Sequence, residues 1–299
     1  MALGYDPTFL PATCPLPDPS AGTPAAAPAV PAVPAAPAAA AEPLPERRIR
    51  RLDYTHFTVL LDADRRLAAV TGVNIDGDTL ADVPRSDDWR LDPRVPADEQ
   101  AGPELYARND LDRGHLVRRR DPVWGSAAEA RRANEDTFVY TNAAPQAAGF
   151  NQSKELWNGI EDHVLDYAET YRQRLCVFTG PVFDPADSVY RGIRIPERFW
   201  KVAAWADASS NRLRATGYLL DQSPQLDGID LETARAGARA LAEPPPLGPF
   251  RTFQVPIADI AALVGAAMPE LRAADAYLAP LRAAGRRWTR LESYGQIRL

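Results

Sequence analysis

The chain of 299 residues has little lysine, cysteine or histidine, and it lacks any long apolar run. Only Lys154 and Lys201 are lysines, so nearly all basic residues are arginine, a bias that a GC-rich genome also produces. The two cysteines, Cys14 and Cys176, exclude a disulfide scaffold and a four-cysteine zinc site, and leave one bridge between them open. No stretch approaches the ~20 apolar residues that span a bilayer. With no signal peptide at the N-terminus, we expect a cytoplasmic protein without a membrane partner.

The net charge of −6 argues against a protein that coats nucleic acid through bulk electrostatics. The charge is uneven, however, and a groove needs only a local basic patch. One such patch is a run of arginines: Arg113, Arg118, Arg119, Arg120, Arg131 and Arg132. These side chains either widen a nucleic-acid footprint or form an ordinary solvated charged surface.

The composition divides the chain into an arm and a single domain. Residues 15–46 are dominated by proline and alanine, which predicts an extended segment that does not pack. We therefore expect a flexible arm over 1–46 and one domain over 47–299. Tyr5, Phe9 and Leu10 either dock on the domain surface or belong to a disordered tail.

Apolar periodicity predicts a mixed α/β domain. Strands are expected at 54–61, 67–74, 137–141, 175–181, 199–206 and 213–220. Helices are expected at 151–174, 257–268 and 271–284. The remaining polar stretch, 78–107, is expected to be irregular.

Four short motifs follow one another in the middle of the chain. They are Asp-Leu-Asp-Arg-Gly-His at 110–115, Thr-Asn-Ala-Ala-Pro-Gln at 141–146, Phe-Asn-Gln at 150–152 and Trp-Asn-Gly-Ile-Glu at 157–161. An imidazole can deprotonate water, amide and carboxylate oxygens suit a hard divalent cation, and arginine grips phosphate. These are the parts of a metal-assisted phosphodiester hydrolase.

The set of motifs resembles the DNA/RNA non-specific endonucleases of the ββα-metal type, over roughly residues 50–220. The resemblance implies an α+β fold with a central antiparallel sheet and a ββα-metal active-site motif. It also implies that His115 is the general base, that Arg113 lies near the scissile phosphate, and that Asn151 holds a single Mg²⁺, with Mn²⁺ as an alternative. Gly114 is expected to let the backbone turn so that the histidine faces the cleft.

The same resemblance assigns roles to three more residues. Asn142 would support the site or touch substrate, and Arg85, with Arg90 in reserve, would clamp phosphate. Glu161 would contact metal-bound water. The ten-residue interval from Asn151 to Glu161 is longer than in the Serratia-like members, so Glu155, one helical turn from the asparagine, is an alternative acid.

The function expected from the resemblance is a Mg²⁺-dependent endonuclease that cleaves DNA and RNA with little sequence preference, because it contacts the backbone. Two alternatives stay open: a catalytically silent nucleic-acid-binding protein on the same scaffold, and a regulated effector nuclease in defence or cell death. A protein inhibitor or regulator and a homodimer are further expectations about partners.

Overall fold

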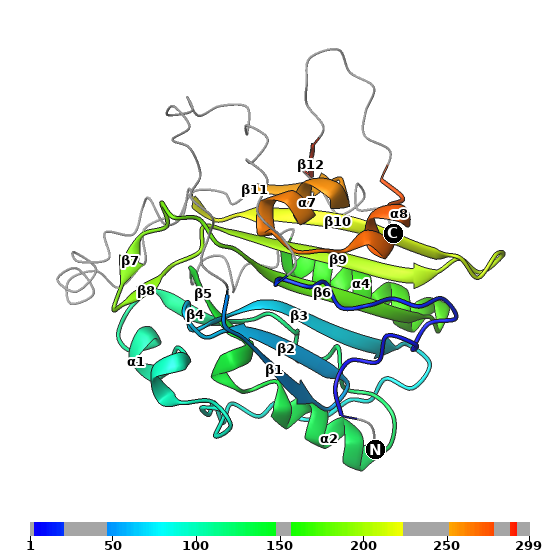
Figure 1. The fold of residues 1–299 in the computed structure, drawn as a ribbon. Coiled ribbons are helices and arrows are strands. Elements are labelled where there is room, and N and C mark those ends of the chain that lie inside the picture. Colours follow the sequence, from blue (N-terminus) through cyan, green and yellow to red (C-terminus); the bar gives the residue numbers. More distant parts are fainter. Residues whose placement is uncertain (1–2, 21–46, 148–156, 224–250, 278–287, 292–299) are drawn as a thin grey trace.

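The centre of the molecule is an antiparallel sheet of eight strands (Figure 1). The computed structural model describes residues 3–20, 47–147, 157–223, 251–277 and 288–291, with the side chains of 157–163 left out. In spatial order the strands are β1 (Ile49–Tyr54), β2 (Phe57–Asp62), β3 (Leu67–Asp76), β6 (Arg174–Val182), β9 (Arg198–Ala206), β10 (Leu213–Asp221), β11 (Arg251–Val255) and β12 (Thr289–Leu291). This arrangement confirms the expected α+β fold with a central antiparallel sheet.

Both faces of the sheet are buried, which is why its strands are apolar almost throughout. In β6, Leu175 and Val177 point into one hydrophobic cluster, and the alternate residues Cys176 and Phe178 point into another. That alternation is the period of two of an extended strand. The first cluster lies under helix α4 (Trp157–Tyr171), and the second is covered mainly by helices α7 (Ile257–Val264) and α8 (Pro269–Ala273).

Two shorter hairpin-like pairs flank the main sheet. Strand β4 (Leu111–His115) pairs with β5 (Ala143–Ala147), and β7 (Val189–Tyr190) pairs with β8 (Ile193–Arg194). The remaining regular elements are helices α1 (Pro103–Tyr106) and α2 (Ala127–Asp136) and the single 3₁₀ turns η1 (Ala97–Glu99) and η2 (Tyr140–Asn142). In chain order β4, β5 and α4 form the ββα unit that was expected.

Residues 3–20 pack against the sheet, so they are not part of a flexible arm. The Tyr5 side chain is 4% exposed, and its hydroxyl donates to the Cys14 carbonyl at 2.5 Å. The Tyr5 amide donates to Thr58 Oγ1 at 2.8 Å, and the Gly4 amide donates to the Tyr54 carbonyl at 2.7 Å. Docking, the first of the two alternatives, is therefore the correct one. The Pro/Ala-rich residues 21–46 lie outside the described residues.

Several predicted elements need correction. The strand expected at 54–61 is two strands, because His56 adopts a left-handed φ of 67° between β1 and β2. No strand forms over 137–141; η2 occupies its end, and β5 begins only at Ala143. Helix α7 ends before Gly265, at a φ of 61°, and α8 ends at Ala273, so both are shorter than predicted.

We predict that Tyr5→Ala lowers the free energy of unfolding by about 3 kcal/mol, the order found when a large buried ring is removed. The ring lies 5.3 Å from that of Phe178, and its hydroxyl bond is lost as well. Urea denaturation measures the change. The matched control is Thr8→Ala, at an exposed position of the same segment, which should stay within about 0.5 kcal/mol of the parent. Equal stability of the two variants would contradict the packing.

Candidate active site

The motif at 110–115 contains the whole of strand β4, and His115 is the last residue of that strand. In the antiparallel register His115 lies opposite Ala143, and Leu111 lies opposite Ala147. The histidine is therefore at the end of the pair where the chain enters β5 from η2. Pairing of these two strands brings the first two motifs together over a separation of about thirty residues.

Gly114 is required for a different reason from the expected turn. It lies within β4, and its φ is not in the left-handed region. A Cβ atom at this position would lie 2.0 Å from Cδ and Oε1 of Gln146, whose residue is 2% exposed. The glycine and the Pro-Gln step thus form one packing unit across the two strands.

Asn142 holds the end of β4 in place from inside the protein. Its side chain is completely buried. Oδ1 accepts from the Val117 amide at 2.9 Å, and Nδ2 donates to the carbonyls of Val117 at 3.0 Å and Thr137 at 3.1 Å. The side-chain amide of Asn142 is thus engaged with the backbone on both sides, and its role toward the site stays a prediction.

Aromatic rings enclose the imidazole of His115. Its centroid lies 4.7 Å from the Trp89 ring and 5.1 Å, edge to face, from the Phe138 ring. The Nε2 atom is buried and finds no hydrogen-bond partner among the described residues. A buried polar atom without a partner is uncommon, because its desolvation is uncompensated. This nitrogen is the group with which a general base would accept a proton.

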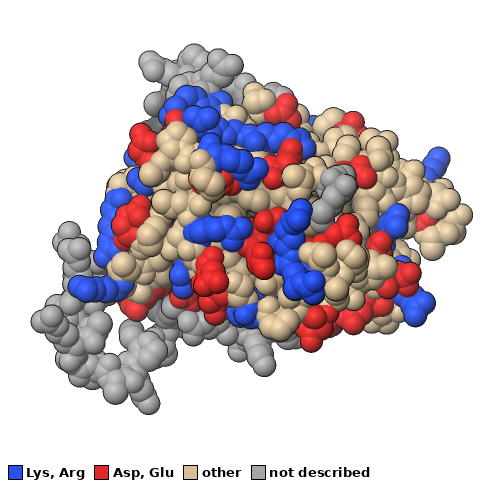
Figure 2. Space-filling model, turned by 90° about the horizontal axis from the view of Figure 1, so that it is seen from below, with Lys and Arg blue, Asp and Glu red and all other residues tan. Residues whose placement is uncertain are grey.

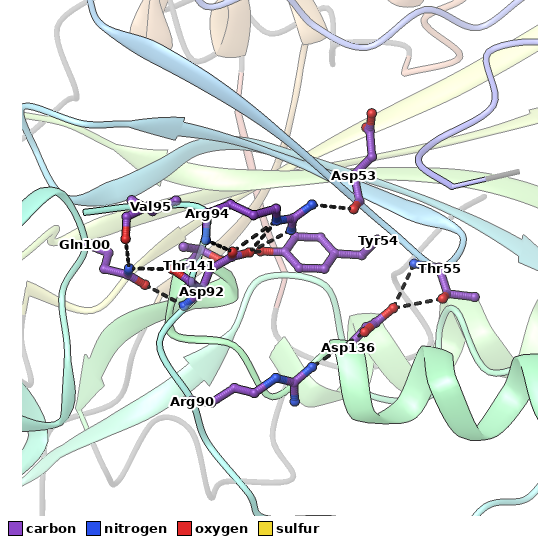
Figure 3. Close-up of polar contacts among 10 residues, drawn as sticks. All are labelled: Asp53, Tyr54, Thr55, Arg90, Asp92, Arg94, Val95, Gln100, Asp136 and Thr141. Atoms are coloured by element: carbon purple, nitrogen blue, oxygen red, sulfur yellow. Dashed lines mark hydrogen bonds and ion pairs between the residues drawn. The ribbon is translucent and has the colours of Figure 1, made fainter. Parts of the chain in front are cut away.

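Trp89 belongs to a segment that runs beside η2. The Arg90 amide donates to the Phe138 carbonyl, and the Tyr140 amide donates to the Arg90 carbonyl, both at 3.0 Å. The guanidinium of Arg90 points to the end of α2, where it pairs with Asp136 at 3.5 Å (Figure 3). Arg85 also pairs with an acid, Asp87, at 2.9 Å, but of the two arginines considered for phosphate it is the one whose charge acts on His115.

A buried polar network around Asp92 fixes this segment (Figure 3). The carboxylate accepts from the Tyr54 hydroxyl at 2.5 Å and from Arg94 Nη2 at 2.6 Å. The Gln100 side chain bonds both the amide and the carbonyl of Asp92, each at 2.9 Å. The Tyr54 hydroxyl also meets Thr141 Oγ1 at 2.7 Å, next to Asn142. The network therefore ties the Trp89 segment to β1 and to the entry of β5.

The electrostatic environment of His115 is positive. Burial, followed by repulsion from Arg85 and Arg119, lowers the pKa of its imidazole to about 3; Asp87 opposes this effect and Arg113 adds to it. The Arg113 guanidinium lies 5.3 Å from the Trp89 ring centroid, and that of Arg85 lies 5.7 Å from the Phe138 ring centroid. Arg113 and Arg85 thus lie beside the two rings that enclose His115, and their expected roles toward phosphate stay predictions.

Arg119 is a residue of the site that the motifs did not single out. Its Nη1 donates to the Val83 carbonyl at 2.9 Å and to Asn134 Oδ1 at 3.0 Å. Burial, followed by repulsion from Arg85, lowers the pKa of its guanidinium. The motifs did not point to Trp89 or Phe138 either, because neither residue belongs to one of them. On the side of α1 and α2, basic side chains lie in interrupted rows between acidic ones (Figure 2).

The expected metal ligands fall outside what the structure describes. Asn151 and Glu155 lie in the undescribed segment 148–156, and Glu161 lies in α4 without a described side chain. Among the described residues, no three histidine, cysteine, aspartate or glutamate side chains form a group that could hold a metal ion. The metal site therefore stays a prediction.

The ββα unit, with a histidine at the end of its first strand, defines a fold shared with a class of nucleases. The chain matches the profile of the DNA/RNA non-specific endonuclease family over residues 37–271, and it belongs to this family.

Two kinds of relative are similar to the chain. It is 41% identical to the uncharacterized protein y4fB of Sinorhizobium fredii over 239 residues, which cover 77% of this chain and 35% of the relative. It is 28% identical to mitochondrial endonuclease G of Homo sapiens over 160 residues, which cover 50% of this chain and 51% of that protein. It is also 28% identical to mitochondrial endonuclease G of Bos taurus over 157 residues, which cover 48% of this chain and 50% of that protein. The chain thus spans about half or less of these relatives.

A solved structure shows the same fold. The crystal structure of an EndoG/EndoGI complex, described as showing the mechanism of EndoG inhibition, superposes with a TM-score of 0.53 at 19% identity. The match covers 74% of this chain and 85% of the solved chain. Separately, none of the helices in the described parts of the chain is long and apolar enough to cross a membrane.

We predict that Gly114→Ala destabilises the protein and that Gln146→Ala relieves much of that effect. The added methyl group would collide with the Gln146 side chain, and truncation of the glutamine removes the collision. A double-mutant cycle in urea should give a coupling energy of about 1–3 kcal/mol. Additive effects of the two substitutions would show that the close approach does not determine the need for glycine.

The His115 imidazole should titrate well below an ordinary histidine in the metal-free protein, which NMR of its ring protons measures. Arg85→Gln should raise its pKa partway, since repulsion falls but burial remains. Arg90→Gln is the control, because that guanidinium pairs with Asp136. As the folded pKa lies below the unfolded value of ~6.5, the stability that His115 contributes is complete above that pH and declines as the pH falls towards 3. An unshifted titration near 6.5 would refute this environment.

Proposed function

We propose that this chain is a metal-dependent endonuclease that hydrolyses phosphodiester bonds of DNA and RNA with little sequence preference. Family membership supports the nuclease activity. The observation that carries the assignment is the buried, unpartnered Nε2 of His115, enclosed by Trp89 and Phe138 and faced by arginine charge.

His115 is the proposed general base. It would take a proton from the attacking water at Nε2, where a neutral imidazole has a free lone pair. Its low pKa keeps the ring neutral in the free protein. A phosphodiester held by Arg85 and Arg113 would offset their repulsion, so the basicity of the imidazole would rise when substrate binds.

The arginines would hold the phosphate and stabilise its developing charge. They recognise the backbone and not the base edges, which accounts for low sequence preference. Asn142 would act as a positioning residue through the Val117 backbone. Asn151 is the proposed ligand of one Mg²⁺ or Mn²⁺, and Glu161 or Glu155 would bond to its water shell. When bound, such an ion would supply charge stabilisation at the leaving oxygen.

The partners proposed for the chain are nucleic acids and an inhibitor. The solved fold neighbour is a complex of EndoG with EndoGI, which supports a search for a protein inhibitor of this chain as well. Restraint by such a protein would suit a nuclease that acts as a regulated effector. A homodimer of this chain is also proposed.

We expect His115→Ala to lower cleavage of plasmid DNA and of RNA by ~10²–10⁴-fold, the usual contribution of general-base catalysis. EDTA should abolish cleavage by the parent protein. Added imidazole should restore part of the activity of the variant, because truncation leaves space between the Trp89 and Phe138 rings.

Unchanged thermal unfolding and unchanged oligonucleotide binding in EDTA serve as controls for this variant. A His115→Ala protein as active as the parent would overturn the assignment. Nucleic-acid binding by the parent without cleavage under any divalent ion would instead favour the silent binding protein.

A further inference from the structure

A hollow of about 390 Å³ opens between the β2–β3 turn and the β7–β8 hairpin. It is separate from the residues around His115. The side chains that matter most at its wall are those of Arg47, Asp62, Asp64, Arg65, Phe183 and Arg194. Three of these six residues are arginines, and none of the three belongs to the candidate active site.

The arginines of the hollow are held in place by groups that do not neutralise them. The Arg65 guanidinium lies 4.6 Å from the Phe183 ring centroid, and Phe183 itself packs against two of the hydrophobic clusters. Arg194 Nη1 donates to the Asp187 carbonyl at 2.9 Å, and Arg47 Nη1 donates to the Val264 carbonyl at 3.4 Å. Aromatic rings and carbonyls orient a guanidinium but leave its full charge.

The two carboxylates of the hollow have other partners. Asp62 is 1% exposed, and its Oδ1 accepts from the backbone amides of Asp64 and Arg65, each at 3.1 Å. Asp64 pairs with Arg48 at 2.7 Å, outside the hollow. Burial lowers the pKa of Arg47, with Asp62 opposing and Arg65 adding to the effect. Positive charge therefore exceeds negative charge at this wall.

The hollow adjoins the far end of the strand that carries His115. The β7–β8 hairpin is tied to the chain just before β4, since Arg191 Nη1 donates to the carbonyls of Glu104 and Ala107. Ile193 of β8 shares a hydrophobic cluster with Leu111, the first residue of β4. From Leu111 to His115 the strand advances ~13 Å at ~3.3 Å per residue. That length corresponds to about four nucleotides of duplex at ~3.4 Å each.

We propose that Arg47, Arg65 and Arg194 form a second phosphate-binding site, which holds the backbone of a nucleic acid several nucleotides from the scissile bond. This proposal rests on the proposed nuclease function. Planar guanidinium groups match phosphate oxygens, and the hollow is open to solvent beside the exposed Arg194. A free phosphate or a mononucleotide has the same chemistry, so the experiment must separate these sources.

The test is oligonucleotide binding in EDTA, measured by fluorescence anisotropy with a labelled strand or duplex of about 20 nucleotides. Arg65→Ala/Arg194→Ala should weaken binding about tenfold near physiological salt and lower the slope of log affinity against log salt by ~1 per arginine. The matched control is Arg212→Ala/Arg214→Ala, which removes the same charge from exposed positions around the β9–β10 hairpin. Arg194→Glu serves as a second variant that leaves the Arg65–Phe183 contact intact.

Substrate length separates this site from the active site. In Mg²⁺, the double variant should show a raised KM and an unchanged kcat on the long substrate. It should equal the parent on a trinucleotide, which is too short to reach the hollow. Lower affinity in EDTA without any cleavage by the parent would support the second site while refuting the nuclease function. If the double variant bound the long oligonucleotide as tightly as the control variant does, the proposal would be overturned. So would loss of inorganic phosphate or mononucleotide binding, measured by calorimetry, with oligonucleotide binding unchanged.

Discussion

The buried amide of Asn142 is the constraint on which the site depends. Asn142 is the last residue of η2, directly before β5. Its side chain bonds the backbone of Val117, just after β4, and the carbonyl of Thr137, just after α2. A buried amide satisfied by three backbone groups has few alternative arrangements. The position of His115, two residues before Val117, is therefore set by hydrogen bonds that substrate does not disturb. The first motif thus supplies the histidine, and the second supplies the asparagine that fixes its position.

The arginines create a conflict between binding and basicity. The charges proposed to hold phosphate also lower the pKa of the imidazole proposed to accept a proton. Burial against Trp89 and Phe138 acts in the same direction. A bound anion would ease this conflict, because it would offset the charge of the guanidinium groups that face the ring. The basicity of the imidazole would then rise when the substrate is in place, although the effect of burial would remain.

The long strands of the sheet could be predicted because their apolar runs are strong and local, as in 67–74, 175–181 and 199–206. Strands β4 and β5 could not, since Leu-Asp-Arg-Gly-His and Ala-Ala-Pro-Gln-Ala have little β propensity and are strands only through their pairing. Helix α2 was missed although Ser126 and Glu129 form a capping box whose Ser-x-x-Glu pattern is visible in the sequence. The catalytic motif could be read, whereas the aromatic enclosure of His115 depends on contacts between distant segments.

An acidic protein can still bind an acidic polymer if its cations are few, oriented and uncompensated. The net charge of −6 opposes indiscriminate binding, and several exposed arginines are balanced by nearby acids, as Arg48 is by Asp64 and Arg85 is by Asp87. In the hollow, and at Arg119 of the candidate site, carbonyls and an aromatic ring orient the guanidinium groups while leaving their charge available. Recognition through such groups depends on phosphate spacing and not on base identity. In the proposed nuclease, low sequence preference would follow from where the charge is left unpaired, and not from a general excess of basic residues.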